Sequence, residues 1–413
     1  MVNITDIPHQ PLAGVVVIDF ATHTAGPIIS RVLGDWGATV IKVESKEGEL
    51  SRWSDAGQGM PLEDGNGPSF AVVNVNKRAL SIDMKAEGAK EVFYSLLAKA
   101  NVMCTNMREP ALKKLGADWE TVHEKFPHLI WARLSGYGEE GAMASEPGFD
   151  SVSYFARGGA MLDFCDAKDE YPLPAPLGFG DNVLGITLAG GVSAALVKQA
   201  RTGQGSKVIT NLYANAIWAA GQMLQVSQGD KVSYPRSRFS GTPLNNTYRA
   251  KDGGWFLFTA FVPKQYAAVA KALGIEWVLN DSRFETVEKA TEHNTELIPI
   301  IDEAFAKFTT EEAEKMLTEN DVPHGQLRHV KDIVTDQQAK DNHMIFPYTF
   351  EPTGREYWLA SSPIKFDGTH PQPQNYPAPY LAEHTVEVLK EFGFADDKIE
   401  DLLNRKVIFQ RGR

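Results

Sequence analysis

The segment Pro11–Glu44 has the pattern of a β-α-β unit, and this unit constrains the fold of the whole chain. A continuous apolar run, VVVIDF, begins at Val15 and suits a strand that is covered on both faces. Helical spacing follows over Ala25–Gly37, and a second strand pattern over Thr39–Glu44 completes the unit. Apolar runs and helical patterns then alternate as far as Leu134. We therefore predict a doubly wound, Rossmann-like α/β sheet, in which ligands lie at the carboxyl ends of the strands.

The turn after the first strand reads ATHTAGP and does not contain G-x-G-x-x-G. That glycine fingerprint is what brings a dinucleotide pyrophosphate close to the backbone. Without it, we interpret Glu44 as a strand-end charge and not as a ribose-binding acid. A nicotinamide-dependent oxidoreductase is therefore an alternative outside the predicted class. The chain also lacks the G-x-S-x-G elbow and the P-loop signature, so serine-hydrolase and P-loop chemistries have no sequence support.

The chain has 413 residues, a net charge of −12 and two cysteines, Cys104 and Cys165. The acidic balance argues against nucleic acid or an anionic membrane as a partner. Two cysteines cannot form a disulfide framework, and the N-terminal residues lack a secretory pattern, so we expect a cytoplasmic protein. No window approaches the roughly 18 consecutive apolar residues of a membrane span. The histidines are scattered without metal-ligand spacing, and we expect no metal.

A change of texture near residue 230 predicts two domains and a C-terminal segment. Residues 1–230 carry the alternating pattern and are predicted to form the large domain, in which Ser45–Asn74 is a long ordered loop over a site. Residues 231–330, with a strand at Gly254–Ala260 and several helical stretches, are predicted to form a smaller α+β domain. Residues 331–413 form the C-terminal segment.

Asp181 follows Gly178-Phe179-Gly180 directly and stands where a long apolar helix is predicted to begin. A carboxylate held there by glycine-permitted backbone can be an exposed nucleophile. Aspartate is also a preferred N-cap, whose oxygens accept the free amide hydrogens of the first helical turn. The local sequence leaves both interpretations open.

Four basic side chains stand near the ends of predicted strands: Lys77, Arg78, Arg108 and Lys114. In a chain of negative net charge, such a cluster can bind phosphates. The alternative is a solvated helix face that carries charge without binding anything.

Motifs along almost the whole chain resemble those of the family III CoA-transferases, the formyl-CoA and carnitine CoA-transferase superfamily. The matching segments are PLAGVVVIDF, AGPIISRVLGDWGATVIKVE, NVNKRALSIDMKAEG, TNMREPALKKLG, LSGYGEEG, PGFD, GFGDNVLG, TGQG and AEHTVEVLKEFG. Within the superfamily, GYGEEG, PGFDSVSYFARGG and GFGD are most similar to the phenyllactate and 2-hydroxyisocaproate CoA-transferases of amino-acid-fermenting anaerobes.

The resemblance implies that Asp181 is the catalytic nucleophile. In the family mechanism this aspartate attacks an acyl-CoA thioester, gives a mixed anhydride and then carries the CoA as an aspartyl-CoA thioester. A coenzyme A thioester is then a substrate, and no cofactor is bound permanently. The expected acceptor is a 2-hydroxyacid or an aryl acid of the phenyllactate or 2-hydroxyisocaproate type.

The resemblance also implies binding residues, position by position. The implied CoA site consists of Thr24, Ile82, Asp83, Lys85, Asn106, Met107, Arg108 and Lys114. Phe149 and Asp150, in the PGFD motif, are implied to form part of the acyl pocket, although ordinary core packing is an equally good interpretation of Phe149.

Two further alternatives concern the same residues. An α-methylacyl-CoA racemase needs a histidine base in a stretch resembling PGHD, and this chain has Phe149 there. A non-catalytic CoA-binding protein would leave Asp181 without a purpose. The family fold further implies a homodimer of two interlocked chains, with residues 331–413 returning to the large domain.

Overall fold

The computed structural model describes residues 10–164, 171–229, 237–368 and 377–412, so Cys165 lies outside the described residues. The chain divides into two compact units. The first comprises Met1–Gly158, Ala175–Gln222 and Gln337–Arg413, and the second comprises Gly159–Pro174 and Met223–Asp336. The predicted domain boundaries at residues 230 and 330 stay predictions.

A seven-stranded sheet forms the centre of the first unit. Its strands are β1 (Val16–Asp19), β2 (Thr39–Glu44), β3 (Lys77–Ile82), β4 (Val102–Thr105), β5 (Ile130–Ser135), β6 (Lys207–Asn211) and β12 (Ile408–Phe409). The spatial order is β12-β3-β2-β1-β4-β5-β6. All neighbours pair in parallel except β12, which runs antiparallel to β3. The order 3-2-1-4-5-6 of the parallel strands is that of a Rossmann-type sheet, and the direction of winding reverses between β1 and β4. The predicted α/β class is confirmed.

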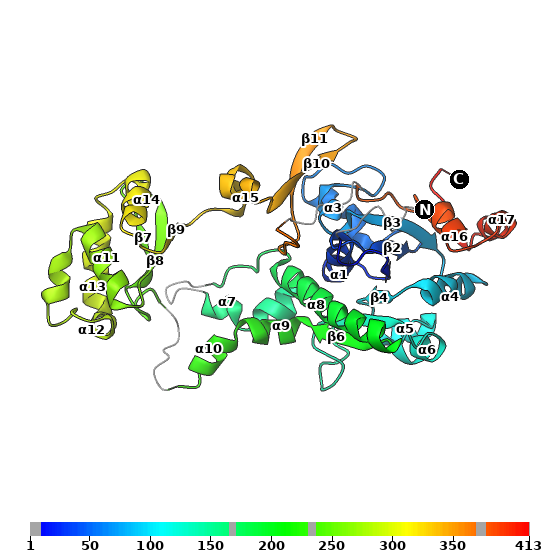
Figure 1. Ribbon diagram of the computed structural model, residues 1–413, viewed down its shortest axis with the longest axis horizontal. Helices are drawn as coiled ribbons and strands as arrows, with labels where there is room; N and C mark the ends of the chain where they lie inside the picture. Colours follow the sequence, from blue (N-terminus) through cyan, green and yellow to red (C-terminus); the bar gives the residue numbers. More distant parts are fainter. Residues whose placement is uncertain (1–9, 165–170, 230–236, 369–376, 413) are drawn as a thin grey trace. The chain divides into compact units, whose positions relative to one another are not determined.

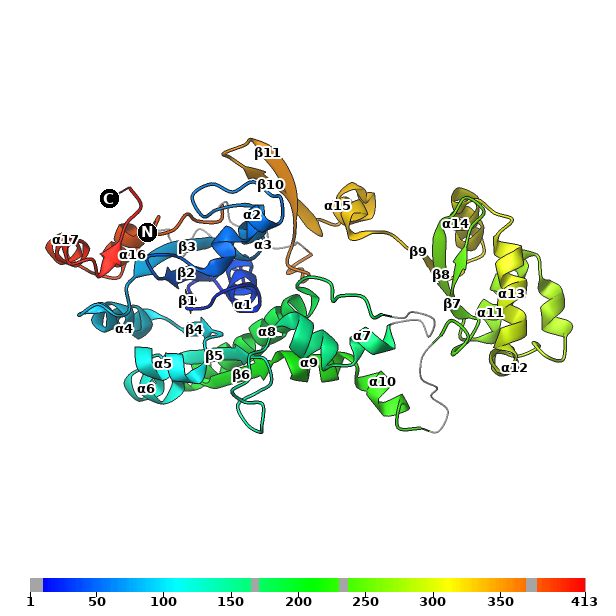
Figure 2. The same ribbon diagram turned by 180° about the vertical axis from the view of Figure 1, so that it is seen from behind.

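Helices cover both faces of this sheet (Figures 1 and 2). Those of the first unit include α1 (Ala25–Asp35), α2 (Ser54–Gly57), α3 (Pro68–Asn74), α4 (Ala89–Lys99), α5 (Glu109–Leu115), α6 (Trp119–Lys125), α8 (Phe179–Thr202), α9 (Leu212–Ala219), α15 (Gln337–Asp341), α16 (Thr385–Glu391) and α17 (Asp396–Asn404). Two short non-α turns, η2 (Leu50–Trp53) and the π-helical η3 (Asp150–Ala156), complete the set.

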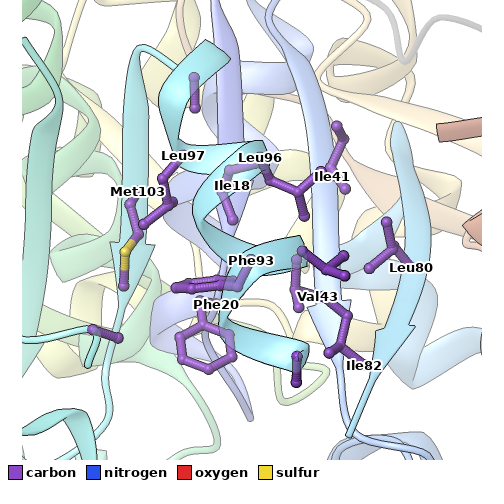
Figure 3. Close-up of a cluster of buried hydrophobic side chains, with 14 of the residues drawn as sticks. Ile18, Phe20, Ile41, Val43, Leu80, Ile82, Phe93, Leu96, Leu97 and Met103 are labelled. Atoms are coloured by element: carbon purple, nitrogen blue, oxygen red, sulfur yellow. The ribbon is translucent and has the colours of Figure 1, made fainter. Parts of the chain in front are cut away.

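The apolar strands supply side chains alternately to two cores, as the side-chain period of a strand requires. On one face, Ile18 and Ile41 pack with Phe93 and Leu96 of α4, and Figure 3 shows the Phe93 ring lying against Phe20. The centroids of these two rings are 4.9 Å apart. On the other face, Val17 and its strand neighbours pack against α1 and α8. Burial on both faces explains why the strands read as continuous apolar runs.

The packing of α8 against α1 fixes the helix that carries Asp181. A Cβ placed on Gly185 would overlap the Ile28 side chain of α1, so glycine lets the two helices approach closely. By length and composition, α8 could also cross a membrane, which the sequence analysis did not anticipate, and 33% of its most apolar window is buried. Core helices of globular proteins meet the same criterion, and Leu184 and Leu188 of α8 belong to the core beside α1.

Two other predicted features differ from the structure. Ser45–Asn74 is not a loop throughout, because it contains η2, α2 and α3. Helix α3 packs against the hairpin of β10 (Ile345–Phe350) and β11 (Arg355–Ala360), and the fully buried Phe70 ring anchors this contact. Asp181 is not an N-cap either: α8 begins two residues earlier, at Phe179, and its N-cap is Gly178.

The second unit has a core of its own. Its elements are the antiparallel strands β7 (Asn245–Arg249), β8 (Trp255–Thr259) and β9 (His324–Gln326), the helices α7 (Ala160–Asp163), α11 (Pro263–Leu273), α12 (Val287–Glu292), α13 (Asn294–Phe305) and α14 (Thr310–Glu319), and the turns η4 (Glu276–Asn280) and η5 (Val330–Thr335). Helix α10 (Gly221–Val226) crosses the division between the units. Apolar side chains of these strands and helices, such as Phe256 and Phe305, pack together in this core.

Candidate active site

A cavity of about 920 Å³ opens at the carboxyl ends of β1, β4 and β5, and Asp181 lies in its wall. The loops after these strands line it through Thr22–Ala25, Asn106 and Ser135–Gly136. This position is the point where the strand order reverses, and open α/β sheets bind their ligands there.

The start of α8 presents the Asp181 carboxylate to this cavity. Gly178 is the N-cap and has a left-handed backbone, with φ of +73°, which favours glycine. The Asn182 side-chain amide donates a hydrogen bond of 2.8 Å to the Gly178 carbonyl and closes the turn. Asp181 is the third residue of the helix, where the free amides and the helix dipole stabilise negative charge.

Burial, followed by repulsion from Asp150, raises the pKa of Asp181 to about 7. A carboxyl group with this pKa is half ionised near neutral pH, and its ionised form is more basic than an ordinary carboxylate. Both properties are typical of catalytic side chains. The Asp181 carboxylate can therefore act as a nucleophile or as a base.

Asp150 lies behind Asp181 and not in the cavity wall. It is the first residue of η3, is 8% exposed, and both its carboxylate oxygens are buried. The backbone amides of Gly178, Gly180 and Asp181 face these oxygens, although none reaches hydrogen-bond geometry. The family resemblance implies an acyl-pocket role for Asp150, and that role stays a prediction.

Close backbone contacts hold the PGFD segment in place. A Cβ on Gly136 would come within 2.6 Å of the Gly148 Cα, so these two loops touch through glycines. Phe149 then lies at the cavity with 59% of its surface exposed. The ring is therefore not a core residue in this chain, and it is free to contact a ligand.

His23 lines the same cavity and was missed in the sequence analysis. Its imidazole meets the Phe149 ring edge-on, with the ring centroids 6.0 Å apart. Its backbone is left-handed, with φ of +62°, which is uncommon for a residue other than glycine and is often found at functional sites. The signal that could have found it is a polar residue in the turn after the first strand of a doubly wound sheet.

A buried network of charges lies beneath this turn. The Asp19 carboxylate accepts hydrogen bonds from the Lys77 ammonium and the Ser30 hydroxyl, each at 2.8 Å. The Lys42 ammonium lies 2.6 Å from the Glu49 carboxylate, and all of these charged side chains are buried. Lys77 is therefore a structural cation and does not bind phosphate.

The predicted CoA-binding residues fall into two neighbouring cavities and one separate position. Thr24, Asn106 and Arg108 line the first cavity together with Asp181. A second cavity, of about 390 Å³, is lined by the predicted residues Ile82, Asp83, Lys85 and Met107. Thr22 belongs to both walls, and its backbone exchanges two hydrogen bonds with the Asn106 side chain, at 3.0 and 2.7 Å.

The remaining predicted cations differ in their surroundings. Lys114 is an exposed residue of α5 that lines neither cavity. Arg78 pairs with Glu387 and Glu391, so it ties α16 to β3 and is not available to phosphate. Besides Lys113, two cations that were not anticipated, Arg133 and Lys207, line the first cavity. Both pair with Glu139, at 2.9 and 2.6 Å.

Among the described residues, no group of three or more histidine, cysteine, aspartate or glutamate side chains could hold a metal ion.

The fold and this site define a class of protein, the CoA-transferases of family III. The family description "CoA-transferase family III" matches residues 12–385, and the chain belongs to this family. The protein is therefore an enzyme that transfers CoA from an acyl-CoA thioester to a free carboxylic acid.

Two curated relatives match almost from end to end. The (R)-2-hydroxy-4-methylpentanoate CoA-transferase of Clostridioides difficile is 34% identical over 96% of this chain and 99% of its own length. The cinnamoyl-CoA:phenyllactate CoA-transferase of Clostridium sporogenes is 34% identical, with 97% of each chain covered. Among solved structures, a CAIB/BAIF family protein from Brucella suis matches with a TM-score of 0.78 at 26% identity, over 93% of this chain and 100% of that one.

Proposed function

We propose that this enzyme transfers CoA to a 2-hydroxyacid or an aryl acid, and that Asp181 carries the CoA during the reaction. The observation behind this proposal is the position of Asp181, whose carboxylate has a pKa of about 7 and faces a cavity at the switch point of the sheet. A carboxylate nucleophile needs no partner base near neutral pH.

In each step of the proposed reaction, one acyl bond forms as another breaks. An Asp181 oxygen attacks the thioester carbonyl, the C–S bond breaks, and CoA leaves as a thiolate while a mixed anhydride forms. The thiolate attacks the Asp181 carbonyl carbon and releases the donor acid, which leaves an aspartyl-CoA thioester. The acceptor carboxylate attacks this thioester and expels the thiolate, which then takes the acceptor acyl group and frees Asp181. Every step exchanges one activated acyl bond for another, so no ATP is consumed.

The two cavities suit the two parts of an acyl-CoA. The small cavity beside Ile82 and Lys85 would hold the nucleotide end, and Arg108, which lines the larger cavity next to it, would bind a phosphate. Thr22 and Asn106 lie where the two cavities meet, and the pantetheine arm would pass there toward Asp181. Lys114 lines neither cavity, so this exposed side chain would contact CoA outside them.

The acyl group would lie between Phe149 and His23. An exposed aromatic ring offers apolar contact to a branched or aromatic side chain, and an imidazole next to it can hydrogen-bond a hydroxyl group. The two relatives described above are named for a branched 2-hydroxyacid and for phenyllactate, which fits such a pocket. A cytoplasmic role in amino-acid fermentation, which the sequence resemblance implies, is also part of this proposal.

A homodimer is part of this proposal. On the first unit, Trp218 is 88% exposed and Val197 is 51% exposed. A hollow of about 820 Å³ beside Val197 is lined mainly by apolar side chains, including Leu196 and Phe366. Exposed apolar surface of this kind marks interaction sites, and a second copy of the chain would cover it.

The transfer reaction can be tested with purified enzyme, phenyllactyl-CoA or 2-hydroxyisocaproyl-CoA as donor, and a labelled acid as acceptor. We expect labelled acyl-CoA from the wild type and none from Asp181→Asn. The matched control is Asp397→Asn, because Asp397 is also in the first turn of a helix but is exposed on α17. Exchange of the α-proton in deuterated water without CoA transfer would instead indicate a racemase.

A further inference from the structure

We propose that Asp150 is a positioning residue for the reaction: its buried carboxylate fixes the first turn of α8 and keeps Asp181 a strong nucleophile. This inference rests on the proposed function, because it assigns Asp150 a task in the same transfer. It differs from the acyl-pocket role that the sequence suggested, since it requires no contact between Asp150 and the substrate.

Tight packing at Gly180 supports this inference. A Cβ on Gly180 would overlap both the Asp150 Oδ1 atom and the Tyr154 ring. The Asp150 carboxylate and the Tyr154 ring therefore press directly on the backbone of the residue before Asp181. Both belong to η3, a π-helical turn, and such turns are frequent at functional sites. Only glycine at position 180 permits this contact.

The buried surroundings of the Asp150 carboxylate also support a role for this residue in the reaction. Asp150 is 8% exposed, and neither of its oxygens has a hydrogen-bond partner among the described residues. A buried carboxylate without hydrogen-bond partners costs free energy. If Asp150 served only to stabilise the fold, hydrogen-bond partners would be expected for its oxygens. Its oxygens instead face the amides of Gly178, Gly180 and Asp181, at the positive end of the α8 dipole.

Other titratable groups surround Asp181 on two sides. Behind it lie Asp150 and the Tyr154 phenol, whose pKa is raised by burial and then by Asp150. Across the cavity lie His23, Arg108, Glu109, Lys113, Arg133, Glu139, Glu146 and Lys207. Of all these groups, Asp150 is the one whose charge raises the pKa of Asp181 in addition to burial.

The chemistry explains why this arrangement is useful. An ordinary thiol has a pKa of about 8.5, while an ordinary aspartate has a pKa of about 3.9, so such a carboxylate is a poor nucleophile for expelling a thiolate. Raising the pKa of Asp181 to about 7 makes the attacking oxygen more basic and the mixed anhydride less unfavourable. The Asp150 charge supplies part of that increase, because it disfavours a second negative charge nearby.

The test is the pH profile of kcat/KM for Asp150→Asn, which removes the charge and keeps the shape. Without repulsion between the two carboxylates, the pKa of Asp181 falls. The acidic limb of the pH profile, where kcat/KM rises with pH, therefore moves from about pH 7 to lower pH. The plateau rate then falls by about threefold for each unit of movement, given a Brønsted slope near 0.5 as for thiolate nucleophiles. Tyr154→Phe is the matched control, and its limb is expected to stay near the wild-type position.

Circular dichroism checks that the Asp150→Asn variant is folded. In the folded variant, an acidic limb of the pH profile that stays in place, or that moves to higher pH, would overturn the inference. Asp150→Ser, which also removes the charge, replaces Asp150→Asn if the asparagine variant does not fold. Formation of the aspartyl-CoA adduct is followed in the same samples. Absence of the adduct in the wild type would contradict the proposed function. If the adduct forms but the acidic limb of the Asp150→Asn pH profile does not move, only the role of Asp150 is contradicted.

Discussion

The Glu49 carboxylate accepts the backbone N–H of His23 through one oxygen and binds the Lys42 ammonium through the other, at 2.6 Å. This contact joins the turn over the active site to the buried charged side chains of β1, β2 and β3. His23 has a left-handed backbone, which costs free energy unless the surroundings hold it. We infer that Glu49 holds it, and that the charge network stabilises the shape of the cavity as well as the fold.

The first prediction concerns Glu49→Gln. The variant leaves the fully buried Lys42 with a weaker set of partners, so we expect a loss of about 3 kcal/mol in the free energy of unfolding, measured in urea. The His23 turn loosens at the same time, and kcat/KM falls. The control is Glu47→Gln, because Glu47 pairs with Lys46 at the exposed surface, where changes stay within about 0.5 kcal/mol. Equal stability of the two variants would contradict the role of Glu49.

The second prediction concerns Gly180→Ala. The added methyl group overlaps Asp150 Oδ1 and the Tyr154 ring, so we expect a loss of about 1–3 kcal/mol in stability and displacement of Asp181. CoA transfer should fall by about 100-fold, because misplacement by about 1 Å can have that effect. Gly57→Ala is the control, since nothing lies within 4 Å of the added atom. Wild-type activity in Gly180→Ala would show that the contact is dispensable.

The third prediction is the pH dependence of activity. Asp181 must be ionised to attack, and its pKa is about 7, so kcat/KM rises with pH through this value. The ionised fraction, and with it the rate, is about tenfold lower one pH unit below the pKa than on the plateau above it. Steady-state kinetics across this range check the prediction. A rate that is flat down to the pKa of an ordinary aspartate would exclude Asp181 as a nucleophile with a raised pKa.

The fourth prediction is that Asp181→Asn stabilises the protein at alkaline pH. Between the ordinary pKa and about 7, native Asp181 keeps its proton while the unfolded chain releases it, so the native state loses stability as pH rises. Asparagine has no charge to bury and avoids this loss. We expect the variant to have a higher Tm than the wild type at about pH 8 and a similar Tm near pH 4. A lower Tm at the alkaline pH would contradict the assigned pKa.

The sequence predicts the central sheet well, because its strands are buried on both faces and therefore read as apolar runs. The range Thr39–Glu44 agrees with β2 at both ends. The motif GFGD similarly places Asp181 at the start of α8, one turn later than its N-cap. The cap itself cannot be predicted from preference alone, since Gly178 takes that position through a left-handed backbone.

Long-range pairing accounts for what the sequence cannot predict. Lys77 and Arg78 look like phosphate-binding cations, but their partners Asp19 and Glu391 are 58 and 313 residues away along the chain. The location of Asp150 behind Asp181 depends in the same way on the contact between η3 and Gly180. Such contacts follow from the packing of whole elements and leave no local pattern.

Mass spectrometry of the intact and of the digested protein, after incubation with an acyl-CoA and trapping with hydroxylamine or borohydride, tests whether Asp181 carries the CoA. We expect a modified peptide that carries the change at Asp181 in the wild type and in Asp397→Asn, and none in Asp181→Asn. A modified residue other than Asp181, or CoA transfer that persists in Asp181→Asn, would contradict this role of Asp181.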